Sequence, residues 1–264
     1  MKVKVIRNYI KDKDSKETEK LLKILKDRNI EIDDKEEKIS EDTDVVIVLG
    51  GDGTILATAC ECAEKEIPVM GINLGRVGFM TETDKGSMEK AIDALLANRY
   101  KIEERMMMDI FIASDSGERS YSALNDLVVS KPDSQMISVG IFAEEEKITE
   151  YIADGVIIAT PTGSTGYSLS AGGPVADPAT EMFLATPVCA HTLKARPAVL
   201  APEKEVTVKL FGGANPFGAV SVDGVLREKI EEGECVKIKK SDKKLKIIKF
   251  GNQSFYDILT AKLL

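Results

Sequence analysis

Tryptophan is absent from this sequence, histidine occurs once, and the four cysteines form no C-x-x-C pair. A chain of 264 residues can bury a core without disulfides, so we expect reduced thiols and no metal bound by cysteine. The formal net charge of -8 argues against binding to nucleic acid or an acidic membrane, because phosphate groups attract basic surfaces. No stretch approaches the roughly eighteen apolar residues of a membrane span. The first residues, MKVKVIRNYI, lack the apolar centre of a signal peptide, and we therefore expect a cytoplasmic protein.

The first hundred residues alternate strand-like and helix-like patterns. VVIVLG, residues 45–50, is apolar on both faces, as a central strand of a parallel sheet must be. Segment 15–30 carries Leu21, Leu22 and Leu25 at roughly helical spacing, and Ser15 can cap that helix. This order of elements predicts a parallel sheet with helical crossovers.

The pattern changes near Met106. Short alternating strands with turn residues between them follow, and the final FYDILTAKLL is apolar enough to be a helix. We therefore predict an α/β domain over 1–102, a β-rich domain over 103–250, and a C-terminal segment over 251–264. The segment is expected to pack back on the N-terminal domain.

The first candidate site is the turn Gly50-Gly51-Asp52-Gly53-Thr54, directly after the buried strand. A glycine-rich turn that leads into a helix presents backbone amides and the positive end of the helix to a phosphate. The turn lacks the Gly-Lys-Ser/Thr of a Walker-type loop, and Leu56 stands where the dinucleotide fingerprint has its third glycine. A hydride-transferring Rossmann domain is therefore disfavoured.

Asp52 is the residue that distinguishes this turn. A carboxylate beside phosphates is unfavourable unless it holds a metal ion or takes a proton from an attacking hydroxyl. We interpret Asp52 as a candidate catalytic base. The alternative is an aspartate that caps the following helix.

The second candidate site is DGVIIATPTGSTGYSLSAGGP, residues 154–174. Its small residues allow close approach to the backbone, its hydroxyls can bond polar ligand atoms, and Tyr167 offers a face for stacking. A merely flexible surface loop is the alternative, which the lack of Lys and Glu between Gly155 and Gly173 disfavours.

The third candidate site is the pair Asn125 and Asp126, which interrupts the apolar strand YSALNDLVVS. An asparagine can hydrogen-bond the edge of an adenine, and an aspartate can accept from ribose hydroxyls. Taken alone, the pair also fits a strand end without function.

Together these stretches resemble the NAD kinase family in order and spacing. The resemblance covers most of the chain and is carried by LGGDGTIL, PVMGINLGRVGFMTE, ALNDLVV, DGVIIATPTGSTGYSLSAGGP, AHTLKARP and SVDG. GGDG alone is shared with diacylglycerol-type lipid kinases and, approximately, with phosphofructokinases, but joined to TPTGSTGYSLSAGGP it is highly specific. The resemblance implies an NAD kinase-like fold, related to the diacylglycerol kinase and phosphofructokinase folds, with an α/β domain and a β-rich domain.

The resemblance also implies an activity: phosphorylation of the 2′-hydroxyl of the adenosine ribose of NAD by ATP, giving NADP. Asp52 matches the proton acceptor, Asn125 and Asp126 match an Asn-Glu pair, and the shorter acid should reach ribose hydroxyls less far. Phe79 would cover the adenine, Tyr167 would stack near the base, and Gly166 stands where alanine is usual. The residues implied in nucleotide binding are Gly51, Gly53, Phe79, Asn125, Asp126, Asp154, Thr162, Thr165, Gly166, Tyr167, Ser168, Leu169 and Ser170.

The same resemblance implies that Mg²⁺ or another divalent cation accompanies ATP. It implies no tightly bound cofactor, no metal-binding residues, and a homodimer or homotetramer. It leaves open whether polyphosphate replaces ATP, whether NADH is accepted and which metabolite inhibits.

Some positions depart from the family pattern. Ile152 stands where many relatives carry Arg, and Ala190 precedes His191 where Pro is usual. We interpret His191 as structural, and Arg76 and Arg196 as candidates for phosphate contacts or ion pairs. Two other functions stay open: a lipid kinase that uses the same GGDG turn, and a catalytically silent NAD-binding sensor.

Overall fold

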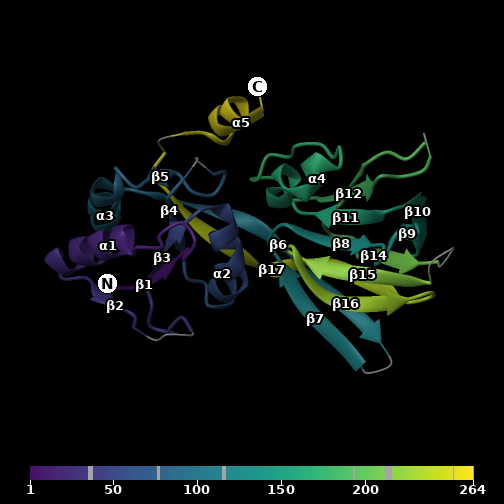
Figure 1. Ribbon diagram of the computed structural model, residues 1–264, viewed down its shortest axis with the longest axis horizontal. Coiled ribbons are helices and arrows are strands. Elements are labelled where there is room, and N and C mark those ends of the chain that lie inside the picture. Colours follow the sequence, from purple (N-terminus) through teal and green to yellow (C-terminus); the bar gives the residue numbers. More distant parts are fainter. Residues whose placement is uncertain are drawn as a thin grey trace. The chain divides into compact units, whose positions relative to one another are not determined.

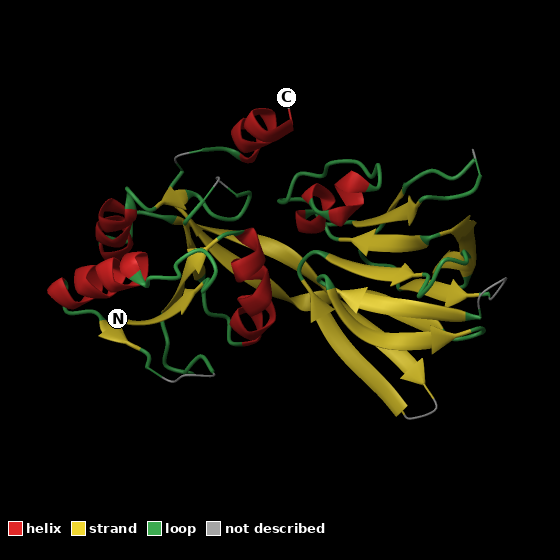
Figure 2. Ribbon diagram, viewed as in Figure 1, coloured by secondary structure: helices red, strands yellow, loops and turns green. Residues whose placement is uncertain are grey.

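The structure is a computed structural model that describes residues 1–34, 38–75, 78–114, 117–192, 194–211, 216–251 and 253–263. The chain forms two compact units, Met1–Arg105 with Lys243–Leu264, and Met106–Asp242. Both division points lie inside strands, β6 (Lys101–Ser114) and β17 (Cys235–Lys249). Figure 2 shows most of the long helices in the first unit and mainly strands in the second. The domain ranges expected from the sequence, 1–102, 103–250 and 251–264, stay a prediction.

The first unit contains a parallel sheet in the order β2-β1-β3-β4, with β5 and the end of β17 also paired in parallel to β4 (Figure 1). This confirms the parallel α/β arrangement expected for residues 2–101. The elements are β1 (Lys2–Arg7), α1 (Lys16–Asp27), β2 (Glu31–Ile32), β3 (Val45–Gly50), α2 (Asp52–Glu64), β4 (Val69–Asn73), β5 (Thr83–Asp84), α3 (Met88–Leu96) and α5 (Phe255–Leu263).

The strand β3 is the buried centre of this unit. All six of its residues are buried, because helices cover both faces of a parallel sheet. Leu25 of α1 and Ile92 of α3 belong to one buried cluster with Ile47 and Leu49 of β3. The helix α2 follows β3 after a single residue, Gly51, so the packed sheet fixes where its N-terminus begins.

The second unit is built from antiparallel strands. One sheet has the order β13-β12-β11-β8-β15-β16, and another part pairs β10, β9, β14 and the start of β17. Alternating residues of both sets share one apolar core, as in a β-sandwich. The further elements are β7 (Gly117–Ala123), β8 (Asp126–Ser130), β9 (Ile137–Ala143), β10 (Glu146–Ala153), β11 (Gly155–Ala159), α4 (Tyr167–Ser170), β12 (Phe183–Val188), β13 (Ala198–Leu200), β14 (Val206–Leu210), β15 (Phe217–Val222) and β16 (Val225–Glu231).

Strand register brings three loops of the second unit to one end of its six-stranded sheet. Ala159, the last residue of β11, pairs with Asp126, the first residue of β8. Val222, the last residue of β15, pairs with Leu127 on the other side of β8. The loop after β11, the Asn125–Asp126 pair and the β15–β16 turn therefore lie together.

Candidate functional site

The glycine-rich turn of the first unit surrounds the N-terminus of α2. Gly51 is the N-cap residue and its backbone is extended, while a Cβ at Gly50 would collide with Thr54. Gly53 has open space where a side chain would lie, and the Lys11 amine is 2.8 Å from the Cβ position of Gly51. A positive helix end with room above it and an ammonium beside it favours an anion.

Asp52 is held by a neighbouring loop, residues 78–81. Its Oδ2 accepts a hydrogen bond from the Phe79 amide at 2.7 Å, and its Oδ1 accepts one from the Met80 amide at 3.1 Å. The loop backbone lies so close that a Cβ at Gly78 would collide with the carboxylate. The helix-cap interpretation is therefore wrong: Gly51 is the cap, and the Asp52 carboxylate bonds a different segment.

Phe79 offers its amide to Asp52 and its ring to the C-terminal helix. The ring centroid lies 5.7 Å from that of Phe255 and 4.5 Å from Nζ of Lys262, both on α5. Covering an adenine stays a prediction for Phe79. Arg76, a candidate for phosphate contact, lies outside the described residues.

In the second unit, Asp223 fixes the backbone of the Asn125–Asp126 pair. Its carboxylate accepts hydrogen bonds from the amides of Leu124, Asn125 and Asp126 at 2.9, 2.8 and 3.1 Å. Asp223 and Gly224 have positive φ of 48° and 76°, as the two-residue turn of a β-hairpin requires. The sequence SVDG is part of the family resemblance, but the resemblance assigned no role to Asp223. An Asp-Gly pair between two alternating strands predicts a hairpin turn, and that pattern could have identified Asp223.

Three polar groups around this backbone are suited to a ligand. Asn125 Oδ1 and Thr162 Oγ1 are buried with no hydrogen-bond partner among the described residues. Asp126 is also buried, with only 6% of its surface exposed. Burial, with a smaller contribution from the charge of Asp223, raises the pKa of Asp126 to about 7. Buried polar atoms without partners are costly, and ligand hydroxyls or amines would satisfy these.

The loop after β11 is packed closely against Asn125. The Thr160 amide donates to the Asn125 carbonyl at 2.9 Å, and a Cβ at Gly163 would collide with the same carbonyl. A Cβ at Gly166 would lie 3.8 Å from Asn125 Nδ2 and 3.9 Å from Asp126 Oδ2. The structure thus brings Thr160, Gly163 and Gly166 to the Asn125–Asp126 pair.

The rest of the loop divides into inward and outward side chains. The Ser168 hydroxyl is fully buried and lies 2.9 Å from the Thr186 hydroxyl, so it supports the loop from within. Tyr167 is 48% exposed at the start of α4, and Ser170 is exposed at its end. Thr165 donates to the Thr162 carbonyl at 3.3 Å, and Leu169 is half-buried.

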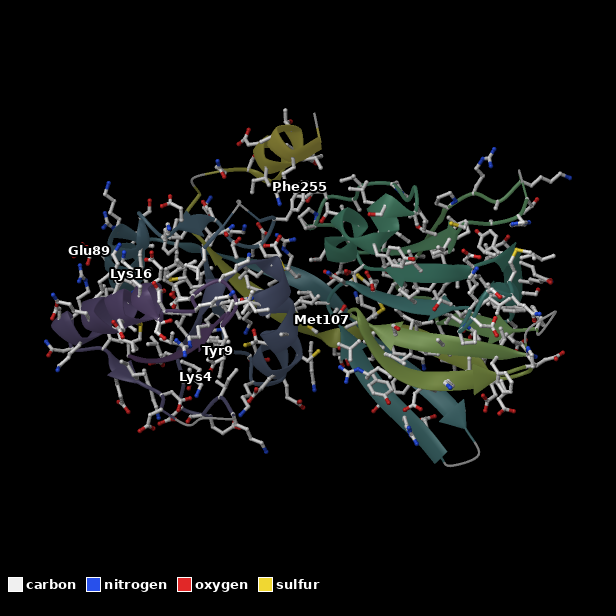
Figure 3. The ribbon with its side chains drawn as sticks, in the orientation of Figure 1. Lys4, Tyr9, Lys16, Glu89, Met107 and Phe255 are labelled. Atoms are coloured by element: carbon white, nitrogen blue, oxygen red, sulfur yellow. The ribbon has the colours of Figure 1, made fainter. Side chains whose placement is uncertain are left out.

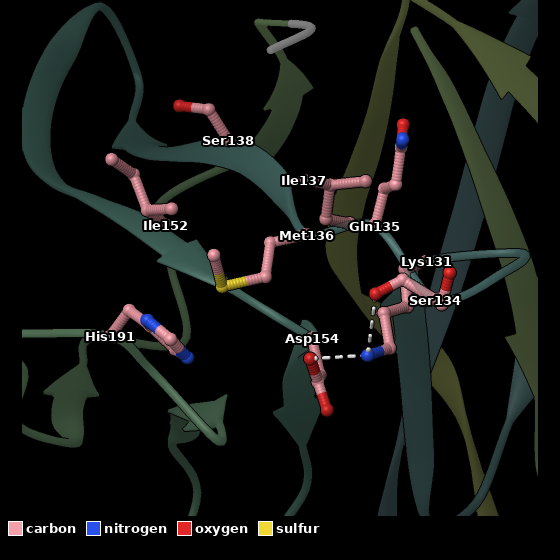
Figure 4. Close-up of a pocket in the computed structure, with 9 residues that line it drawn as sticks. All are labelled: Lys131, Ser134, Gln135, Met136, Ile137, Ser138, Ile152, Asp154 and His191. Atoms are coloured by element: carbon pink, nitrogen blue, oxygen red, sulfur yellow. Dashed lines mark hydrogen bonds and ion pairs between the residues drawn. The ribbon is translucent and has the colours of Figure 1, made fainter. Parts of the chain in front are cut away.

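Asp154 lines a separate pocket of about 540 Å³ in the second unit (Figure 4). Its carboxylate pairs with Lys131 Nζ at 2.7 Å, and the lysine backbone amide donates to the Asp154 carbonyl. Met136, Ile152 and His191 add apolar and ring surface to the same pocket. Ile152, which replaces the arginine of many relatives, is 54% exposed there.

The structure therefore groups the expected residues into separate sets. Asp52 and Phe79 meet in the first unit, and Gly166 lies against Asn125 and Asp126 in the second. Thr162 lies in the same loop as Gly166, with its hydroxyl buried. Among the described residues, no three His, Cys, Asp or Glu side chains are grouped to hold a metal ion. The helices that the structure describes are all too short or too polar to span a membrane.

Comparison with known families matches residues 3–100 to the ATP-NAD kinase N-terminal domain and residues 124–250 to the ATP-NAD kinase C-terminal domain. The NAD kinase of Carboxydothermus hydrogenoformans is 43% identical over 235 residues, covering 88% of this chain and 82% of that protein. The NAD kinase of Natranaerobius thermophilus is 36% identical over 278 residues, covering 99% and 97%.

Solved structures show the same fold. An NAD kinase from Archaeoglobus fulgidus in complex with ATP has a TM-score of 0.79 and 26% identity, covering 99% of this chain and 98% of its own. Yeast NADH kinase complexed with NADH has a TM-score of 0.85 at 22% identity, covering 100% and 87%, and it shares the fold. With both family domains matched and close relatives aligned over most of its length, this chain belongs to the NAD kinase family, a family of phosphotransferases.

Proposed function

We propose that this protein transfers the terminal phosphoryl group of ATP to the 2′-hydroxyl of the adenosine ribose of NAD, giving NADP and ADP. Family membership supports the reaction, and the placement of Asp52 carries the mechanism. A carboxylate held by two amides at a helix N-terminus is a fixed base beside a favourable position for phosphate.

The donor phosphates would lie over the glycine-rich turn. The backbone amides at the start of α2 and the Lys11 ammonium offset their negative charge. A divalent cation that arrives with ATP would neutralise further charge across the phosphates. Mg²⁺ usually keeps several waters and phosphate ligands and takes only one or two carboxylates, so it would be held mainly by the phosphates of ATP.

The acceptor ribose would bind through the polar groups of the second unit. Asn125 and Thr162 have unfilled hydrogen-bonding capacity, and Asp126 adds a buried carboxylate that could accept from ribose hydroxyls. Tyr167 would stack on the base, and Asp154 would bind the other part of the dinucleotide. Gly51, Gly53, Thr165, Leu169 and Ser170 complete the proposed contacts, while Ser168 would act from within the loop through its bond to Thr186.

In the reaction, the 2′-hydroxyl oxygen attacks the terminal phosphorus and gives its proton to Asp52. The new oxygen–phosphorus bond forms as the bond to the bridging oxygen of ADP breaks. Most of the rate enhancement is expected from positioning and from charge stabilisation, because phosphoryl transfer needs little covalent help from protein.

We further propose a cytoplasmic enzyme that works as a homodimer or homotetramer and has no membrane or nucleic-acid partner. The support is the acidic charge and the family resemblance. The same chemistry allows polyphosphate as an alternative donor and NADH as an alternative acceptor. Replacing ATP by polyphosphate, or NAD by NADH, in the assay tests each of them.

The test is to incubate the purified protein with NAD, ATP and Mg²⁺ and to couple the product to an NADP-specific dehydrogenase. We expect NADP formation, with the new phosphate on the 2′-oxygen by phosphorus NMR. Phosphorylation of dioleoylglycerol in vesicles in place of NAD would favour the lipid kinase. Saturable NAD binding without NADP formation would favour the sensor.

A further inference from the structure

The orientation of the Asp52 carboxylate depends on the loop Gly78–Thr81. Two of its hydrogen bonds come from the amides of Phe79 and Met80, and Gly78 packs directly on it. Any shift of that loop therefore moves or frees the carboxylate. The contacts that hold the Gly78–Thr81 loop in place therefore also determine the orientation of Asp52, the proposed base.

Part of the support comes from within the first sheet. The Thr81 side chain is fully buried, and its hydroxyl accepts from Asn73 Nδ2 at 3.0 Å and from the Gly78 amide at 3.2 Å. These bonds fix the two ends of the loop. The middle, where Phe79 lies, has other partners.

The other partners come from the end of the chain, in the same unit. Lys249 Nζ donates to the Phe79 carbonyl at 3.4 Å, and the Phe250 amide donates to Glu82 Oε2 at 3.0 Å. On α5, Phe255 (labelled in Figure 3) packs on the Phe79 ring, and Lys262 lies over the same ring. The carbonyl and the ring of Phe79 are therefore both held by residues more than 160 positions later.

This C-terminal segment is itself well formed. Ser254 and Asp257 exchange side-chain to backbone hydrogen bonds of 3.1 and 2.9 Å, which is a capping box at the start of α5. Ile258 is buried on the helix. Burial lowers the pKa of Lys249, while the nearby carboxylates of Glu103, Glu82 and Asp52 oppose that shift. The Arg105 charge adds to the shift, so the half-buried Lys249 ammonium lies among charges of both signs, Asp52 included.

We propose that the C-terminal segment Lys249–Lys262 is a positioning element for Asp52, which acts by holding both the carbonyl and the ring of Phe79. The segment touches neither substrate in this account. It keeps the Phe79 and Met80 amides aimed at the carboxylate, so that the base faces the attacking hydroxyl in one orientation. The inference rests on the proposed function, because it gives Asp52 a role in catalysis.

The test uses two variants on different parts of the segment, Lys249→Met and Phe255→Ala. Each is expected to lower kcat for NADP formation at least tenfold, while KM and the calorimetric Kd for NAD change less than twofold. Lys249→Arg is expected to restore most of the rate, since it can donate to the same carbonyl. The matched controls are Lys246→Met, a lysine of the same strand that pairs with Glu66 instead, and Thr260→Ala, an exposed residue of α5; both should keep kcat within twofold.

A second readout is hydrogen exchange at the Phe79 and Met80 amides, which we expect to be at least tenfold faster in both variants and unchanged in the controls. Unchanged exchange, or an unchanged kcat, overturns the inference. A fall in kcat matched by an equal loss of NAD binding also overturns it, because it points to general damage. If the wild-type protein makes no NADP, the proposed function fails, and the exchange comparison alone still decides whether the segment holds Asp52.

Discussion

At the scale of single residues, Asp126 is a buried carboxylate with a partly protonated state near neutral pH. Burial raises its pKa to about 7, and the charge of Asp223 adds to the shift. The folded-state pKa exceeds the unfolded value, so folding favours the protonated form. Its contribution to stability is therefore present at low pH and is lost as the pH rises from about 4 toward 7.

Ligand binding should depend on pH in the opposite direction. Ribose hydroxyls donate better to an ionised carboxylate than to a protonated one, so the affinity for NAD should increase severalfold between pH 6 and pH 8. Calorimetric titration with NAD alone over that range measures it. Asp126→Asn should flatten the dependence, and an equally steep dependence in that variant would show that another group is responsible.

The sequence indicates which polar residues are candidates for a cap or a site, but it does not show which groups they hydrogen-bond. Ser15 was expected to cap α1, yet it has a φ of 59° and makes no side-chain cap. The amides of Glu17 and Thr18 bond the carboxylate of Asp12 instead, at 3.1 and 3.0 Å. A charged acceptor that reaches two amides satisfies a helix N-terminus better than one hydroxyl, and only the folded loop decides which is in reach.

At the scale of elements, the β15–β16 hairpin aligns the Asn125–Asp126 pair. Asp223→Ala removes one acceptor from three amides, and it places alanine at a positive φ of 48°. Each amide left unsatisfied costs about 1–3 kcal/mol. We expect a loss of at least about 3 kcal/mol in the free energy of unfolding and a weaker affinity for NAD, measured by denaturant unfolding and by calorimetry.

The matched variant is Asp223→Asn, which keeps one side-chain oxygen and tolerates the left-handed backbone. It should lose less stability and less affinity than Asp223→Ala. Equal affinities for NAD in wild type and Asp223→Ala would contradict the claim that the hairpin positions the pair.

Elements with strong local patterns matched the prediction. The apolar run 45–50 is the buried strand β3, and FYDILTAKLL contains α5. The local pattern of a strand does not show which other strand it pairs with. Residues 244–250, KLKIIKF, fall within the range 103–250 predicted for the β-rich domain. In the structure Ile247 pairs with Val69, and Ile248 lies in the buried cluster of the first unit. Pairing over such a sequence distance depends on the whole sheet.

At the scale of the whole molecule, the first unit is completed by residues from the end of the chain. Ile248 is 3% exposed, so Ile248→Ala should destabilise that unit by about 2–5 kcal/mol. Hydrogen exchange should accelerate at the amides of Val45–Gly50 more than at those of Gly155–Ala159. Ile157→Ala, a buried position in the second unit, should show the reverse order. The same order in both variants would contradict the division of the chain into these units.

The central claim about the molecule is that Asp52 takes the proton from the 2′-hydroxyl of NAD. Asp52→Asn keeps the size of the side chain and the helix N-terminus but removes the base. The most direct measurement is kcat for NADP formation by this variant, together with its calorimetric Kd for NAD. We predict that kcat falls by about two to four orders of magnitude, the range of a lost general base, while NAD binding is nearly unchanged. A variant that keeps near-normal turnover but loses NAD binding would contradict the account.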